Sequence, residues 1–143
     1  MAFKTIIVAF SNLQLDLDPM FQTLIELDLK PETKVILSHV VTMEKSDLDR
    51  EVDRPQSEMG KIDLGELENQ LRLYQEKLPC LTNVEIVMGE PTEEIVRLSN
   101  IYNADLIIIG NRGLKGINRI VQGSVSSQVV AEANCSVLVV QQR

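Results

Sequence analysis

Spaced glycines followed by hydroxyl side chains are the residues of this sequence best suited to bind a charged ligand. Gly110 and Gly113 are followed, after nine further residues, by Gly123 and Ser124. Glycines allow positive φ and a close approach of the backbone to a ligand, and a helix that starts beside them presents free N–H groups at its positive end. Such a segment is typical of a phosphate-binding loop, so the sequence predicts a nucleotide site.

Side chains near these glycines can add hydrogen-bond donors and positive charge. Ser124 and Ser126 offer hydroxyl groups at the expected start of a helix, whereas Arg112 and Lys115 either add charge or face solvent. No P-loop lysine follows the glycines, and neither an acidic pair nor a histidine dyad is recognisable. The residues therefore favour a binding protein over an enzyme.

Five short β-rich runs are expected to form the strands that position these residues. Their near-continuous apolar character is typical of strands covered on both faces of a parallel sheet. The runs are residues 5–10, 34–41, 84–88, 106–109 and 136–140. The last run would form an apolar edge strand that a second copy of the chain can cover.

Helices are expected between these strands. The first is predicted to begin at Asp18 and Pro19, because aspartate is a good cap and proline fits a first turn. Others are predicted near residues 64–78, 91–102 and 124–133, and Val125, Val129 and Val130 are the expected buried side chains of the last.

The alternating pattern predicts the α/β class, with a doubly wound, five-stranded parallel sheet and helices on both faces, which is a Rossmann-like arrangement. Ligands of such sheets bind beyond the carboxyl ends of the strands. The ends of the first two strands should therefore lie near the glycine segment. These ends bring Ala9, Phe10, Ser11, Val40 and Val41 toward the expected site.

Length and charge limit the possible partners. The 143 residues fit one domain, 1–143, in which the charged segment 42–63 is either a mobile connection or a partner-binding segment. A net charge of −7 opposes attraction to nucleic acid or to an anionic membrane, so neither is an expected partner. The longest apolar runs are far too short to cross a bilayer, and a cytoplasmic location is expected.

The cysteines and the single histidine give weaker indications. Cys80 and Cys135 have no metal-binding spacing and are expected to be buried or half-buried thiols. His39 lies near a strand end, where it either faces a ligand pocket or packs and caps neighbouring backbone.

Several segments together resemble the universal stress protein family over nearly the whole chain. They are Lys-Thr-Ile-Ile-Val-Ala, Val-Ile-Leu-Ser-His-Val-Val, Gly-Glu-Pro-Thr-Glu-Glu-Ile-Val, Asn-Ala-Asp-Leu-Ile-Ile-Ile-Gly-Asn-Arg-Gly, Gly-Ser-Val-Ser-Ser-Gln-Val-Val and Cys-Ser-Val-Leu-Val-Val. The resemblance implies a fold like that of the adenine-nucleotide alpha hydrolases. Because the glycine pattern distinguishes the ATP-binding branch, it also implies an ATP site with Mg or Mn, with AMP or a cyclic nucleotide as alternatives.

The resemblance also implies which residues surround the nucleotide. Those expected near the phosphates and ribose are Gly110, Arg112, Gly113, Gly123, Ser124, Val125 and Ser126, and those expected beside the base are Ala9, Phe10 and Val40. One position departs from the family pattern, because Ser11 stands where the family usually has an aspartate. That carboxylate would accept a hydrogen bond from the base or ribose and assist a metal, so nucleotide choice and metal use stay open.

The expected function is that of a non-catalytic or very slow ATP-binding regulator in a stress response. The alternatives are a nucleotide-dependent enzyme, such as a slow ATPase or an adenylyl-transferring enzyme, and a dimeric interaction module without nucleotide. The resemblance further implies a homodimer formed through the strand from Ser136 to Val140. The sequence does not identify a protein partner or distinguish a dimer from a tetramer.

Overall fold

The computed structural model describes residues 3–10, 13–42, 64–112 and 124–142, and strands alternate with helices along them. The strands are β1 (Thr5–Phe10), β2 (Lys34–Val41), β3 (Leu81–Met88), β4 (Leu106–Arg112) and β5 (Ser136–Gln142). The helices are α1 (Leu13–Glu26), α3 (Leu64–Lys77), α4 (Pro91–Ile101) and α6 (Ser124–Glu132). In this part of the chain, no helix has the length and apolar character needed to cross a membrane.

The strands form one parallel sheet whose connectivity reverses at its centre. Within the described residues the sheet has five strands in the order β3-β2-β1-β4-β5, and every neighbouring pair is parallel. The chain thus builds outward from β1 to one edge and then returns to add β4 and β5 on the other side. This topology confirms the predicted doubly wound α/β fold.

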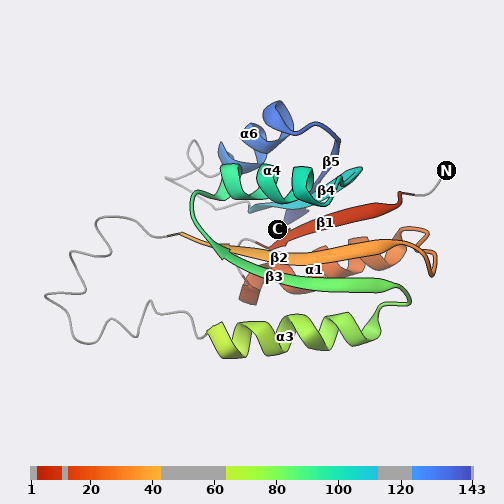
Figure 1. Ribbon diagram of the computed structural model, residues 1–143. Helices are drawn as coiled ribbons and strands as arrows, with labels where there is room; N and C mark the ends of the chain where they lie inside the picture. Colours follow the sequence, from red (N-terminus) through yellow and green to blue (C-terminus); the bar gives the residue numbers. More distant parts are fainter. Residues whose placement is uncertain (1–2, 11–12, 43–63, 113–123, 143) are drawn as a thin grey trace, which may run out of the picture.

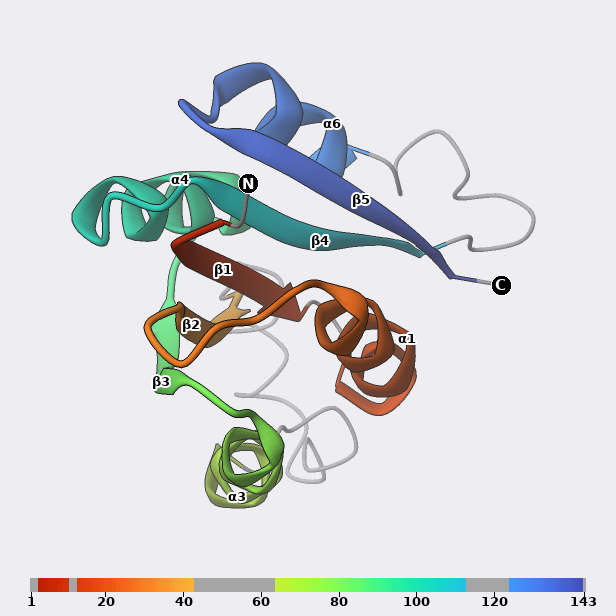
Figure 2. The ribbon, with the colours of Figure 1, turned by 90° about the vertical axis from the view of Figure 1, so that its right-hand side faces the viewer.

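Helices cover both faces of the sheet. Figures 1 and 2 show α1 and α3 on one face and α4 and α6 on the other. Because side chains of a strand alternate between faces, β1 sends Ile6, Val8 and Phe10 toward the first pair of helices and Ile7 and Ala9 toward the second.

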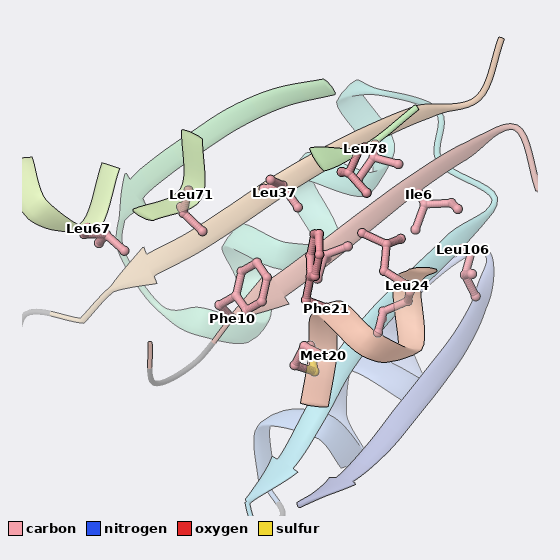
Figure 3. Close-up of a cluster of buried hydrophobic side chains, with 13 residues drawn as sticks. Ile6, Phe10, Met20, Phe21, Leu24, Leu37, Leu67, Leu71, Leu78 and Leu106 are labelled. Carbon is pink, nitrogen blue, oxygen red and sulfur yellow. The ribbon is translucent and has the colours of Figure 1, made fainter. Parts of the chain in front are cut away.

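The larger core lies under α1 and α3. Phe21 and Leu24 of α1 and Leu71 of α3 meet the side chains of the central strands there (Figure 3). Phe21 also stacks on Tyr74 of α3, with the ring centroids 4.2 Å apart, so the two helices contact each other as well as the sheet. Leu67 and Leu71, four residues apart, are the buried side chains of α3.

An aspartate joins β1 to β4 at the amino ends of these strands. The carboxylate of Asp105 accepts hydrogen bonds from the backbone N–H groups of Lys4 and Thr5, each at 2.9 Å. The N–H of Asp105 donates in turn to the carbonyl of Thr5 at 2.9 Å. These bonds set the register in which Ile6 lies beside Leu106.

Besides β3, which begins at Leu81 instead of residue 84, three sequence predictions about these elements are wrong. The helix predicted to begin at Asp18 and Pro19 begins at Leu13, with Pro19 inside it. An internal proline removes its own N–H bond and crowds the carbonyl one turn earlier, a cost that burial of Met20 and Phe21 in the next turn offsets. Val130, expected to be buried, is 53% exposed, because the buried side of α6 is the side that carries Val129.

The third error concerns the end of β4. The strand does not stop at Ile109, since Gly110, Asn111 and Arg112 pair with Val140, Gln141 and Gln142 of β5. Each strand supplies backbone hydrogen-bond partners for the end of the other, so polar residues that the sequence suggests are loop continue both strands. Gly110 therefore lies in extended strand backbone, and the positive φ expected for it is not needed.

Candidate functional site

A pocket of about 220 Å³ opens where the carboxyl ends of strands meet the first turns of helices. Its lining comes from the ends of β1, β2 and β4 and from the starts of α4 and α6. The lining residues are Ala9, Phe10, Val40, Thr42, Pro91, Ile95, Ile109, Gly110, Val125 and Ser126. The pocket therefore lies on the face covered by α4 and α6, at the edge where a doubly wound sheet binds its ligands.

A tight turn between β3 and α4 places the start of α4 at the pocket. The N–H of Gly89 donates to the carbonyl of Val41 at 3.0 Å, and Gly89 has a φ of +154°, which favours glycine. The carboxylate of Glu90 then accepts from the N–H of Glu93 at 2.8 Å and caps the helix. Pro91 follows in the first turn, where its missing N–H costs nothing, and its ring becomes part of the pocket wall.

The floor of the pocket is made of strand residues with small or branched side chains. Ala9 of β1 pairs with Ser38 of β2 on one side and with Ile109 of β4 on the other. The Ser38 hydroxyl is buried and donates to the carbonyl of Val8 at 2.8 Å, so its polarity is satisfied inside the sheet. The short side chain of Ala9 leaves room above the sheet between the two helices.

His39 belongs to the opposite face. Its ring Nδ1–H donates to the carbonyl of Phe10 at 2.6 Å, and the residue is only 4% exposed. Val40, the next residue, lines the pocket, and strand alternation therefore directs His39 toward the other face of the sheet. Of the two predicted roles, packing against neighbouring backbone is the one that His39 has here.

The pocket brings together six of the predicted site residues. These six are Ala9, Phe10, Val40, Gly110, Val125 and Ser126. Arg112 ends β4 and Ser124 begins α6, so the backbone of both is placed at the same edge of the sheet. Three other predicted site residues, Ser11, Gly113 and Gly123, lie outside the described residues. Lys115 and the segment 43–63 also lie outside them.

Four lining residues were missed by the sequence predictions. Thr42 was assigned to the polar segment, although it directly follows β2 and faces the pocket. The sequence places Pro91 and Ile95 only within the helix predicted near residues 91–102, because a helical pattern does not show how α4 packs on the sheet. Ile109 directly precedes Gly110, which was a predicted site residue. This position in the sequence could have identified Ile109 as part of the pocket lining.

In its described lining, the pocket is a mostly apolar cavity with two hydroxyl groups and no charged side chain. Among the described residues that line it, Thr42 and Ser126 carry polar side chains, and none carries charge. Such a lining suits a flat, neutral ring system with a few hydrogen-bonding edges. Among the described residues, no group of three or more His, Cys, Asp or Glu side chains is arranged to hold a metal.

Three ionisable groups with shifted pKa values lie outside the pocket lining. Burial raises the pKa of the half-buried Cys80 thiol, and burial together with the nearby charge of Asp105 raises the pKa of Cys135. Tyr102 donates its hydroxyl proton to Glu85, which raises the pKa of Tyr102, while a hydrogen bond from Asn83 lowers it in part. The raised values keep both thiols protonated at neutral pH, so neither is an activated nucleophile.

The fold and the site define an α/β protein with a pocket at the reversal point of a parallel sheet. Comparison with known families adds that residues 2–141 match the universal stress protein family. The chain belongs to this family, and the resemblance predicted from its segments is confirmed.

Individual relatives agree with this assignment. The universal stress protein Sll1388 from Synechocystis sp. is 39% identical over 70 residues, which are 49% of this chain and 44% of the relative. The alignment thus spans less than half the length of this curated relative. The solved structure of the hypothetical protein MJ0577 from Methanocaldococcus jannaschii matches with a TM-score of 0.73 and 25% identity, over 100% of this chain and 99% of that one.

Two further solved structures share the fold and contain nucleotides. A universal stress protein in complex with cAMP has a TM-score of 0.63 and 19% identity, and the match covers 99% of this chain and 98% of that one. A family member from Arabidopsis thaliana with AMP bound has a TM-score of 0.53 and 17% identity, with coverage of 98% and 92%. At these identities the likeness shows the fold alone.

Proposed function

We propose that this chain is a nucleotide-binding regulator that holds an adenine nucleotide, with ATP as the first candidate and AMP or a cyclic nucleotide as alternatives. The observation that carries the proposal is the pocket at the carboxyl edge of the sheet, whose described lining is uncharged and gathers six residues expected around a nucleotide. Relatives of the same fold that contain cAMP or AMP support the adenine nucleotide as its ligand.

The size of the pocket indicates which part of the nucleotide enters it. At about 220 Å³ it is smaller than the roughly 300–1,000 Å³ typical of complete small-molecule sites, so it suits the base and ribose. The apolar side chains of Ala9, Val40 and Ile95 would enclose the base. The hydroxyl of Ser126 and the first turn of α6 would lie toward the ribose and phosphates, where a helix start favours negative charge.

A divalent metal, Mg or Mn, would arrive with the triphosphate. Magnesium usually keeps several waters and binds substrate phosphates instead of a cage of protein ligands. The described residues fit this mode, because they offer no carboxylate in the pocket lining. The metal would neutralise phosphate charge, while the chain itself encloses the base and orients the ribose.

We propose that the chain binds the nucleotide and hydrolyses it very slowly or not at all. Support comes from the described pocket lining, which holds no carboxylate, histidine or lysine that could move a proton during phosphoryl transfer. A role in stress responses is proposed from family membership.

We also propose a homodimer in which β5 meets the same strand of a second copy. β5 lies at one edge of the sheet, and Leu138 in its middle is 36% exposed. An edge strand with apolar side chains is stabilised when another strand covers it. A two-fold axis at this edge would extend the sheet through both copies.

A pair of tryptophan substitutions on α6 tests the nucleotide proposal. Val125→Trp fills the pocket from its wall, whereas Val130→Trp adds the same ring at an exposed position of the same helix. Calorimetric titration of the full chain with ATP and magnesium, with AMP and with cAMP should show binding of at least one nucleotide. Val125→Trp should weaken this binding about tenfold or more, and Val130→Trp should leave it unchanged.

Two results would overturn the proposal. The wild-type chain, freed of any co-purified nucleotide by unfolding and refolding, could bind none of the three. Alternatively, Val125→Trp could bind the nucleotide as tightly as Val130→Trp does, which would place the ligand elsewhere. Mass spectrometry of the nucleotide released on unfolding identifies what the protein carries when purified.

A further inference from the structure

A side-chain hydrogen bond joins α4 to α6 next to the pocket. The hydroxyl of Thr92 donates to Oε1 of Gln128 at 2.8 Å, and Thr92 is only 2% exposed. Thr92 directly follows Pro91, and Gln128 lies two residues after Ser126. Since Pro91 and Ser126 both line the pocket, the bond connects the two helical walls of the site.

The two helices differ in how firmly the sheet holds them. α4 buries four side chains, Thr92, Ile95, Leu98 and Ser99. Of the α6 side chains described, from Val125 onward, only Ser126 and Val129 are buried, Val125 is half-buried, and the others are exposed. Few contacts with the core fix α6, so its position depends more on its contacts with α4.

We propose that the Thr92–Gln128 hydrogen bond positions α6 against α4 and thereby sets the width of the pocket and its affinity for the nucleotide. This inference rests on the proposed nucleotide site. A pocket whose walls are already at the right separation binds more tightly, because less of the binding energy is spent on ordering the protein. Without the bond, α6 would sample other positions. The apparent affinity for the nucleotide would then be the intrinsic affinity multiplied by the fraction of time that α6 spends in the binding position.

A second hydrogen bond between the same helical segments provides the control. Nδ2 of Asn134, just after α6, donates to Oδ1 of Asn100 near the end of α4, at 3.2 Å. Both asparagines are exposed, and neither lines the pocket. Removing this contact loosens the helices at the end away from the site.

Thr92→Val is the main test, because valine keeps the branched shape of threonine and removes only the hydroxyl. Gln128→Ala removes the acceptor from an exposed position, where the substitution is well tolerated. Each should weaken binding of the nucleotide that the wild type prefers by about fivefold, the effect of one net hydrogen bond. Thr92→Ser should bind close to wild type, and Asn134→Ala should bind as the wild type does.

Hydrogen exchange separates a positioning role from a general loss of stability. In Thr92→Val without nucleotide, the amides of α6 should exchange faster while those of β1 and β4 keep their protection, and nucleotide should restore α6. Equal affinity of Thr92→Val, Gln128→Ala and wild type would overturn the inference, as would equal weakening by Asn134→Ala. A wild type that binds no nucleotide would instead refute the proposed function.

Discussion

Replacing Asp105 should weaken the fold by an amount that its hydrogen bonds define. Its carboxylate accepts two backbone N–H bonds at 2.9 Å, from Lys4 and from Thr5. Bonds to a charged acceptor contribute about 1.5–3 kcal/mol each, and partial exposure to water favours the lower end. Asp105→Ala should therefore lower the free energy of unfolding by about 3 kcal/mol.

Asp105→Asn separates the two bonds. The amide keeps one acceptor oxygen but turns an NH₂ group toward the second backbone N–H, so one bond is lost and one remains. The expected cost is about 1.5–2 kcal/mol, or roughly 5 °C in Tm for a chain of this size. The bond from the N–H of Asp105 to the carbonyl of Thr5 is made by backbone and should persist.

Urea unfolding at one fixed protein concentration, followed by far-ultraviolet circular dichroism, measures the change. Asp28→Asn is the matched control, since Asp28 pairs with Lys30 at 3.1 Å on the surface, where an ion pair contributes about 0–1 kcal/mol. The midpoint should shift for Asp105→Asn without a change in slope. If Asp105→Asn and Asp28→Asn lower stability equally, the two backbone bonds do not hold β1 to β4 as argued.

Three further outcomes are expected. Gly89→Ala should cost at least about 1 kcal/mol in urea unfolding, because alanine disfavours a φ of +154°, and the adjacent Glu94 side chain can move aside from the new Cβ. Cys135 should react faster with iodoacetamide at pH 8 in Asp105→Asn than in wild type, because burial still raises its pKa but the Asp105 charge no longer does; equal rates would contradict this. Leu138→Lys should convert the proposed dimer to monomer in analytical ultracentrifugation, and an unchanged mass would exclude β5 as the interface.

The fold could be predicted because the three central strands, β1, β2 and β4, are mainly buried. Continuous apolar runs such as 106–109 leave few alternatives to a parallel sheet covered on both faces. Errors arose where neighbours, not local sequence, decide the structure. Gly110 and the residues after it form strand only because β5 supplies partners for them. Helix α1 extends before Pro19 although proline is typical of a helix start.

The candidate site was predictable to the extent that topology alone places residues together. The ends of β1 and β2 and the start of α6 follow from strand order, so Ala9, Val40 and Val125 were found. Pro91 and Ile95 were missed because they reach the pocket only through the way α4 packs on the sheet. The face to which His39 points was open until the register of β2 fixed it.

The Asp105 contacts and the pocket lie at opposite ends of the same two strands, β1 and β4. The two ends of these strands can therefore differ in how many substitutions they tolerate. Substitutions at the pocket end can alter which small molecule is selected while the anchoring at the amino end is unaffected. A scaffold divided in this way is suited to diversification, because new ligand preferences can be acquired without first having to compensate for a weakened fold.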